Sequence, residues 1–299
     1  MTPTLAVVVP ATDEPATLDR CLAAIGAAED PPAELIVVRE PRHSGPAAAR
    51  NRGAKGVTSE IVAFVDSDVL VHPDAFVRIR EAFARDDGLV AVFGSYDDAV
   101  PPDDLVGGFR NLLHHVVHQR SAGEVHSFWA GLGAVRRSAF DGVGGFDAGR
   151  YPHPSIEDIE LGGRLAPTGR ILLDPELRGT HLKRWTLSSM VRTDFGRRGV
   201  PWIELLVEQR RIPATLNLGA RERASAVAAI AVAYGVLRRR PLVVATGLAA
   251  GIALNRDLVE LLHRRLGVRG AIAGIGLHAL HQLTAVAAVP FGLASARRR

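Results

Sequence analysis

Short apolar runs alternate with helix-like segments along the first third of the chain. This alternation is the sequence feature that most restricts the possible fold classes. The runs are rich in β-branched residues and predict buried strands at Leu5–Pro10, Leu35–Val38, Ile61–Val65 and Val90–Gly94. Apolar residues at helical spacing predict helices at residues 16–28, 47–54 and 74–85. Strands that alternate with helices of this length form βαβ units. We therefore expect an α/β fold, with a mixed, mainly parallel sheet and flanking helices.

Asp66 and Asp68 directly follow the third of these runs. Side chains two residues apart in an extended chain point the same way, so the two carboxylates can close on one cation. Ligands of open α/β sheets bind at the carboxyl ends of the strands. Mg²⁺ and Mn²⁺ prefer oxygen ligands, and Mg²⁺ is commonly held by one or two carboxylates together with substrate phosphates. The tripeptide favours a metal-assisted nucleotide-diphosphate site. Taken alone, it also fits a solvated turn or a helix cap.

Five segments occur in a fixed order along the chain. They are Val9–Pro10 through Asp13–Glu14, Gly45–Gly53, Asp66–Asp68, Gly144–Asp147 and Glu157–Leu161. As a set they resemble the inverting family 2 glycosyltransferases, over about residues 4 to 212. The resemblance implies the GT-A fold, with a Rossmann-like nucleotide-binding half. It also implies transfer of a sugar from a nucleotide-diphosphate sugar to an acceptor hydroxyl.

The resemblance further implies which residues bind the donor. These are Pro10, Thr12, Asp13, Glu14, Glu40, Arg50, Asn51 and Asp66. In the family, the helix with Arg50 and Asn51 lies beside the nucleotide and diphosphate, where a cation suits the phosphates. The family commonly has two aspartates after its second strand, whereas this chain has Arg39 and Glu40. The identity of the nucleotide base is therefore left open.

By the same resemblance, Asp66 and Asp68 bind a divalent metal, Mg²⁺ or Mn²⁺, with Asp68 as the more direct ligand. His181 stands where some GT-A enzymes place a further metal ligand, and a purely structural role is the alternative. Asp158 matches the general base that deprotonates the acceptor hydroxyl, so that one displacement inverts the anomeric carbon.

Residues on the acceptor side are expected to be Trp129, Gly131, Gly145, Glu157 and Trp185. Trp185 loosely resembles the end of an acceptor-side motif of related synthases, without the Gln or Arg that begins that motif. An ordinary core position is the alternative for both tryptophans. Gly145 is also compatible with a plain turn.

A helix is predicted at Ser155–Leu165, and its start has a second interpretation. Ser155 as the N-cap with Asp158 three residues later would form a capping box. The cap and the base are compatible roles, because the helix dipole favours a carboxylate near the N-terminus.

The last third of the chain places arginine clusters beside apolar stretches. Arg238–Arg240, Arg264–Arg265 and Arg297–Arg299 accompany Ala224–Leu237, Pro241–Leu254 and Gly270–Ala296. Such clusters suit an anionic membrane surface. They lack the polar or aromatic surface that contacts nucleotide bases, so we expect no nucleic-acid partner. Cys21 is the only cysteine, which excludes an intrachain disulfide and a cysteine metal cluster.

We therefore expect a glycosyltransferase domain at residues 1–215 and a membrane-associated helical region at 216–299. The expected location is the cell membrane, with the catalytic domain facing the cytoplasm. This arrangement would suit a lipid or lipid-linked acceptor. A soluble helical subdomain packed on the catalytic domain is the alternative.

Two other functions compete with sugar transfer. A sugar-phosphate nucleotidyltransferase would carry a glycine- and arginine-rich phosphate loop after its first strand, but Ala11–Pro15 is acidic and has no glycine. The second alternative is a non-catalytic, membrane-bound nucleotide-sugar binding protein. Asp66, Asp68 and Asp158 together argue against it, and donor turnover would separate it from an enzyme.

Overall fold

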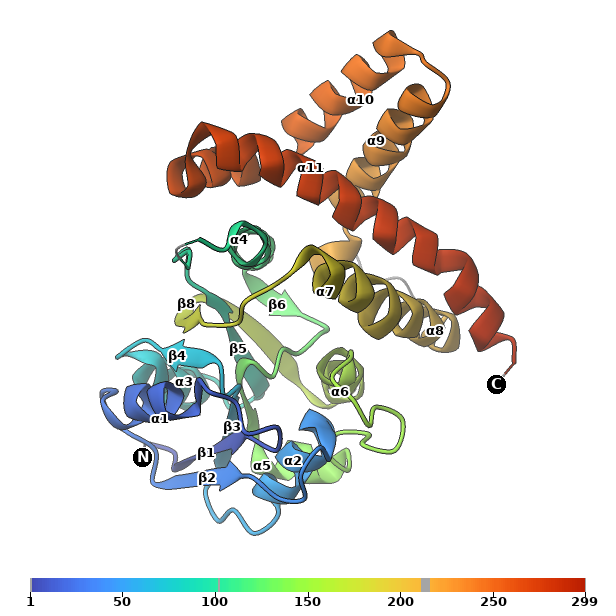
Figure 1. The fold of residues 1–299 in the computed structure, drawn as a ribbon. Coiled ribbons are helices and arrows are strands. Elements are labelled where there is room, and N and C mark those ends of the chain that lie inside the picture. The colour runs from blue at the N-terminus through green and yellow to red at the C-terminus, as the bar shows by residue number, and fades with distance from the viewer. Residues whose placement is uncertain (1, 102, 211–215, 299) are drawn as a thin grey trace. The chain divides into compact units, whose positions relative to one another are not determined.

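A computed structural model describes residues 2–101, 103–210 and 216–298, in two compact units (Figure 1). Unit 1 comprises Met1–Asp97 and His118–Lys183, and unit 2 comprises Asp98–Val117 and Arg184–Arg299. The predicted domain boundary at 215–216 borders residues 211–215, which lie outside the described residues, and it stays a prediction.

Unit 1 is built on one mixed sheet. Its described strands are β1 Leu5–Pro10, β2 Glu34–Val38, β3 Ile61–Val65, β4 Val69–Val71, β5 Leu89–Tyr96, β6 Gly123–Val125, β7 Leu132–Arg136 and β8 Arg170–His181. The strand order is β2-β1-β3-β7-β5-β8-β4, and β6 pairs with β8. The β1–β2, β1–β3 and β5–β8 pairs are parallel. β7 runs antiparallel between β3 and β5, and β4 and β6 run antiparallel to β8. The four predicted strands are confirmed.

Helices cover both faces of this sheet. They are α1 Leu18–Gly26, α2 Gly45–Ala54, α3 Ala75–Arg85, α5 Arg137–Gly142 and α6 Glu157–Leu165, with the end of α4 Leu105–Arg120 and a short 3₁₀ turn, η1 Ala166–Thr168. On one face, Ile25 of α1 and Phe76 of α3 join the core formed by the odd-numbered residues of β1 and β3. On the other face, Phe64 of β3 contacts Phe140 of α5, with ring centroids 5.5 Å apart. Side chains that alternate along each strand thus pack into two apolar cores, one on each face of the sheet.

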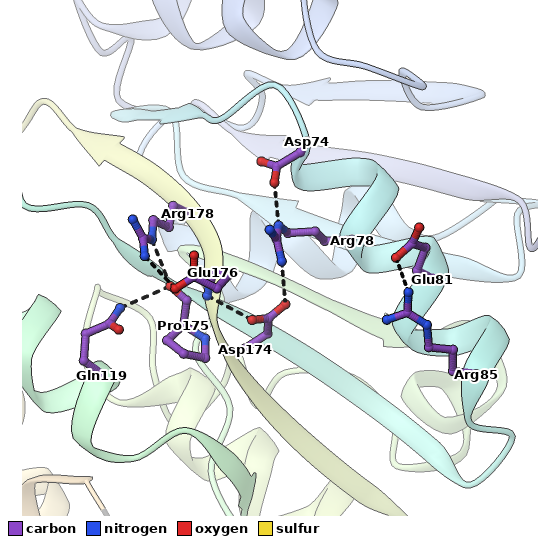
Figure 2. Close-up of polar contacts among 9 residues, drawn as sticks. All are labelled: Asp74, Arg78, Glu81, Arg85, Gln119, Asp174, Pro175, Glu176 and Arg178. Carbon is purple, nitrogen blue, oxygen red and sulfur yellow. Dashed lines mark hydrogen bonds and ion pairs between the residues drawn. The ribbon is translucent and has the colours of Figure 1, made fainter.

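A surface network connects α3 to β8 (Figure 2). Arg78 Nε donates to Asp74 Oδ2 at 2.5 Å, and Arg78 Nη1 lies 3.7 Å from Asp174 Oδ2. Gln119 Nε2 donates to the Pro175 carbonyl at 3.1 Å. Exposed ion pairs of this kind contribute about 0–1 kcal/mol each, so the buried faces of α3 and β8 dominate their packing.

Unit 2 is helical. It contains most of α4 together with α7 Leu187–Arg192, the π-helix η2 Thr193–Gly199, α8 Val200–Gln209, the 3₁₀ turn η3 Leu216–Leu218, α9 Ala220–Leu237, α10 Pro241–Leu254 and α11 Arg256–Ala296. The helices predicted in the last third are confirmed. The last one begins earlier than predicted, and Gly267 breaks its helical geometry with φ of 70°. Apolar side chains of α4, among them Phe109 and Leu112, pack with Leu258 and Leu262 of α11.

One buried ion cluster holds η2 against two helices of unit 2. Arg110 Nη1 of α4 donates to Asp194 Oδ1 of η2 at 2.8 Å, and His281 Nδ1 of α11 lies 2.7 Å from Asp194 Oδ2. Burial alone would raise the pKa of Asp194, but the bond from His281 and the charge of Arg110 hold it below its usual value. The cluster fixes the π-helix between α4 and α11.

Candidate active site

The Asp66–Asp68 turn sits where the sequence predicted it, at the carboxyl end of β3. The Asp66 amide donates to the Gly131 carbonyl at 3.0 Å, and the Leu182 amide donates to the Asp68 carbonyl at 2.8 Å. The Val69 amide donates to the Asp66 carbonyl at 2.9 Å, which closes a tight turn into β4. Both carboxylates are partly open to solvent, with side chains 31% and 25% exposed. The turn is therefore held at both ends while its acids stay accessible.

Arg50 lies buried between two carboxylates from distant parts of the chain. Its Nη2 donates to Asp66 Oδ1 at 2.7 Å, and its Nη1 donates to Glu157 Oε1 at 2.9 Å. Its Nε is buried and has no hydrogen-bond partner among the described residues. Burial would lower the pKa of Arg50, but Asp66, Glu157 and Asp158 raise it above its usual value. The predicted donor-side cation is thus already neutralised by two acids of the site.

The surroundings of Asp66 disfavour the ionised form of its carboxyl group. Burial raises the pKa of Asp66 above its usual value, although Arg50 acts in the other direction, and the neighbouring Asp68 adds to the rise. Two carboxylates this close favour a bound cation, because a shared positive charge relieves both effects.

Asn51 joins α2 to the glycine turn. Its Oδ1 accepts from the Phe146 amide at 2.8 Å, and its Nδ2 donates to the Phe146 carbonyl at 2.7 Å. Gly145 has φ of 69°, and a Cβ there would lie 2.6 Å from Asn51 Oδ1. Glycine is therefore required both by the backbone and by the close approach of the amide. The Asn51 side chain, predicted on the donor side, is engaged by this turn.

Asp158 lies in the first turn of α6, half-buried. Its Oδ1 accepts from the Ile159 amide at 2.9 Å, and its Oδ2 accepts from the Ala130 amide at 3.3 Å. The predicted capping box is wrong, because Ile156 is the N-cap and the helix has no side-chain cap. The Ser155 amide instead donates to Glu157 Oε2 at 2.8 Å, which starts the helix two residues later than predicted.

The Trp129–Gly131 segment connects the two halves of the site. Ala130 contacts Asp158 and Gly131 contacts Asp66 through the backbone bonds above. The Trp129 indole covers Gly131, where a Cβ would lie 2.3 Å from Trp129 Cζ2. Trp129 also meets the Tyr96 ring edge-on, with centroids 4.8 Å apart. The sequence placed Trp129 and Gly131 on the acceptor side, which stays a prediction; the segment that contains them bonds to the Asp66 amide and to the Asp158 carboxylate.

His181 lies at the end of β8, stacked on Tyr96 with ring centroids 4.1 Å apart and an interplanar angle of 8°. Its Nε2 is 3.6 Å from Asp68 Oδ2. Burial alone would raise the pKa of Asp68, but His181 holds it below its usual value. Sequence reasoning missed Tyr96, which ends β5 two residues beyond the predicted strand end at Gly94.

The donor set fits a hard divalent cation that also binds substrate phosphates. No cluster of three or more His, Cys, Asp or Glu side chains is preformed as a metal site in the described part of the chain. Asp66 and Asp68 supply two carboxylates, and a magnesium-type site commonly takes one or two, with phosphates completing the shell. His181 stands beside Asp68 as the nitrogen donor that the sequence suggested.

The loops after β1 and β2 meet at the same edge of the sheet. The His43 amide donates to the Thr12 carbonyl at 3.2 Å, and His43 Nδ1 lies 3.0 Å from Asp13 Oδ1. The Arg42 guanidinium pairs with Glu14, and the Arg42 amide donates to Glu40 Oε2 at 3.0 Å. The sequence named the acids and Thr12 but missed Arg42 and His43, which partner them. Pro10 ends β1 directly before this loop.

Trp185 belongs to unit 2. Its ring lies under the Arg110 guanidinium, 4.9 Å from the centroid, and its amide donates to Asp104 Oδ2 at 3.2 Å. Its predicted place on the acceptor side is untested and stays a prediction.

Residues 33–144 match the model of the family described as glycosyl transferase family 2. Within this segment the match supports a family 2 glycosyltransferase domain. No curated protein matches its sequence. Among solved structures, this glycosyltransferase is similar to the mannosyltransferase PcManGT from Pyrobaculum calidifontis in complex with GDP-Man and Mn²⁺, with 17% identity over 97% of this chain and 87% of that one. The TM-score of 0.56 shows the shared GT-A fold.

A second similar structure is S. aureus TarS 1–349, with 13% identity, 93% of this chain and 90% of that chain covered, and a TM-score of 0.48. A third is GalNAc-T7 with UDP, GalNAc and Mn²⁺, with 14% identity, 76% and 51% covered, and a TM-score of 0.48.

Proposed function

We propose that the chain is a metal-dependent, inverting glycosyltransferase that moves a sugar from a nucleotide-diphosphate sugar to an acceptor hydroxyl, with Asp158 as general base. One observation carries the proposal. A single segment, Trp129–Gly131, bonds to Asp66 on one side and to the Asp158 carboxylate on the other. A donor-side acid and a candidate base are thereby fixed to the same short piece of backbone.

Asp66 and Asp68, with His181 beside them, would hold Mg²⁺ or Mn²⁺, which would supply positive charge to the diphosphate leaving group. The loops with Thr12, Asp13, Glu14 and Glu40 would bind the nucleoside. Their acids point to hydrogen-bond donors on the base and ribose rather than to phosphate. Much of the rate would come from this positioning of the donor.

Asp158 would take the proton from the acceptor hydroxyl while that oxygen attacks the anomeric carbon from the face opposite the diphosphate. The bond to the diphosphate oxygen breaks in the same step, so the carbon inverts and no enzyme nucleophile is needed. Two amide bonds, from Ile159 and Ala130, orient the Asp158 carboxylate. A base must lie within hydrogen-bond reach of the proton that it abstracts, so this orientation matters for the rate.

A lipid or lipid-linked molecule is the proposed acceptor, at the cell membrane and with the catalytic unit facing the cytoplasm. The support comes from unit 2. Among the described residues, one helix, α11, is long and apolar enough to cross a membrane by length and composition. A lipid acceptor would bring the hydroxyl to an enzyme held at the bilayer surface.

Release of nucleoside diphosphate from UDP-, GDP- and dTDP-sugars, with Mn²⁺ or Mg²⁺ and membrane lipid extract, tests the proposal. We expect lipid-dependent release from one donor, and its loss in Asp158→Asn and Asp68→Ala. Asp87→Asn, at an exposed surface position, is the matched control and should behave as wild type. Nucleotide binding without release from any donor would instead favour the non-catalytic binding protein.

A further inference from the structure

Exposed large apolar side chains are concentrated in unit 2. Among the described residues of unit 1, Leu35 is the one large apolar side chain that is well exposed. The helices α9 and α10 alone expose Val227, Ile230, Tyr234, Val236, Leu237, Leu242, Leu248 and Ile252. Leu237 and Leu242, at the two ends of the connecting turn, are each 80% exposed. Apolar patches of this kind mark interaction surfaces in soluble proteins.

Four of the exposed side chains of α9 form one stripe. Val227, Ile230, Tyr234 and Leu237 recur at intervals of three and four residues, which places them on one side of the helix. The side that faces α10 carries Ala228, Val232 and Gly235. The four side chains of the stripe remain exposed.

Glycines allow α9 and α10 to pack closely. A Cβ at Gly247 would lie 3.1 Å from the Ala228 carbonyl, and a Cβ at Gly235 would lie 2.9 Å from the Val244 amide nitrogen. Gly247 and Gly251 are four residues apart on α10, in the pattern that brings helix backbones together in lipid. Val232 and Val244 fill this contact, while the stripe of α9 and Leu242 remain exposed and available to another partner.

The positive charge of residues 220–299 favours an anionic partner. Residues 220–299 contain twelve arginines and three acidic residues, for a formal charge of +9, whereas residues 1–219 carry −5. Arg238, Arg239 and Arg240 form the exposed turn between α9 and α10. Anionic lipid attracts such a cluster. A second copy of the chain would instead bring two strongly positive regions together, which like-charge repulsion opposes.

α11 has the length and composition of a membrane helix, but its contacts within unit 2 make it less suited than the hairpin to enter lipid. Its last half packs within unit 2, where His281 pairs with Asp194 at 2.7 Å and Phe291 lies 5.2 Å from the Phe195 ring. Those partners belong to η2, which also carries Arg197 and Arg198. Drawing α11 into a bilayer would break the buried pair or bring these charges into hydrocarbon, and both are costly.

The length of α10 limits how deeply the hairpin can enter the bilayer. α10 has 14 residues and no charged side chain. At 1.5 Å per residue it is about 21 Å long, shorter than the roughly 30 Å hydrocarbon core. We therefore expect the arginines of the α9–α10 turn to lie at the level of the lipid phosphates.

We propose that the α9–α10 hairpin is the surface by which this chain docks on an anionic membrane. The stripe Val227–Leu237 and Leu242 enter the acyl region, and Arg238–Arg240 contact lipid phosphates. The inference deepens the proposed function, on which its meaning for a lipid-linked acceptor rests, by naming the element and the lipid charge involved.

Sedimentation of the full-length chain with vesicles tests this. We expect binding to vesicles of phosphatidylcholine mixed with phosphatidylglycerol, and much weaker binding to phosphatidylcholine alone. The triple variant Arg238→Glu, Arg239→Glu, Arg240→Glu should lower the partition coefficient by at least about 100-fold, since each arginine at an anionic surface contributes about fivefold. A matched control, Arg20→Glu, Lys55→Glu, Arg85→Glu, changes the net charge equally on exposed positions of unit 1 and should bind as wild type.

An apolar variant tests the other half of the surface. Ile230→Asn with Leu237→Asn and Leu242→Asn changes only exposed positions, so circular dichroism should show an intact fold. Binding to anionic vesicles should fall at least about tenfold through lost apolar burial. Equal binding to both vesicle types, equal loss in the unit 1 control, no effect of the apolar variant, or no vesicle binding at all would each overturn the inference.

Turnover measured on the same preparations keeps the two proposals apart. Vesicle binding without nucleotide release would count against the proposed function alone. Nucleotide release without vesicle binding would count against the docking surface alone.

Discussion

Two carboxylates from distant parts of the chain share the Arg50 guanidinium, Asp66 at 2.7 Å and Glu157 at 2.9 Å. The sequence placed a cation near the phosphates from the family resemblance, and it gave no sign that the same cation would bridge the donor and acceptor sides. Arg50 lies 16 residues from Asp66 and 107 from Glu157 in the sequence, and such separations leave no periodicity to detect. The family motif predicted a role for Arg50, but its two carboxylate partners are seen only in the folded structure.

Arg50→Lys should lower the thermal midpoint and the transfer rate. Lysine keeps the charge but cannot donate to two carboxylates in a fixed fork, and one buried acid loses its partner. Breaking a buried pair costs on the order of 3–5 kcal/mol. Arg52→Lys, at an exposed position of the same helix, is the control and should be neutral. Calorimetry that shows equal midpoints for both variants would contradict the bridging role.

Gly145→Ala should destabilise unit 1 by about 1–3 kcal/mol. The positive φ at this position strains an alanine, and its Cβ would press on the Asn51 amide that fixes the turn. Gly142→Ala is the control, because a Cβ there meets nothing within 4 Å and φ is not positive. Denaturant unfolding gives the free energy of unfolding of both variants, and equal values would contradict this prediction.

At the scale of elements, the βαβ pattern predicted the parallel strands β1 to β3 but not the antiparallel β7 that lies between β3 and β5. A sequence pattern shows which segments are extended. It does not show the order of strands that are far apart in the chain. β8 extends over 12 residues and pairs successively with β6, β5 and β4. The end of β8 places His181 beside Asp68, with His181 Nε2 3.6 Å from Asp68 Oδ2.

The pairing of η2 with α4 and α11 predicts a pH dependence. The pKa of Asp194 is lower in the folded state than in the unfolded state, so the unfolded chain takes up the proton first as the pH falls. The stabilisation is fully present above the unfolded pKa of about 3.9 and is lost as the pH falls through the folded value. Asp194→Asn should therefore be less stable than wild type at neutral pH, with a difference that shrinks below about pH 4. Urea unfolding that shows a constant difference at all pH values would contradict this.

At the scale of the whole molecule, charge and apolar exposure are divided along the chain, with a basic and apolar-rich region after residue 219 and an acidic catalytic part before it. Composition predicted this division. It could not predict that α11 breaks at Gly267, nor that residues 98–117 join the helical unit. Both depend on contacts that form only when the chain is folded.

The central claim is that Asp158 acts as the base of a metal-dependent transfer, and one paired measurement tests it most directly. The turnover rate and the dissociation constant of the nucleoside diphosphate with Mn²⁺ are determined for wild type and Asp158→Asn. We predict a rate lower by about 10²–10⁴-fold with unchanged nucleotide binding, because a base acts on the proton and not on the donor. An unchanged rate would contradict the assignment of Asp158. A loss of nucleotide binding equal to the loss of rate would show that the residue serves the donor instead.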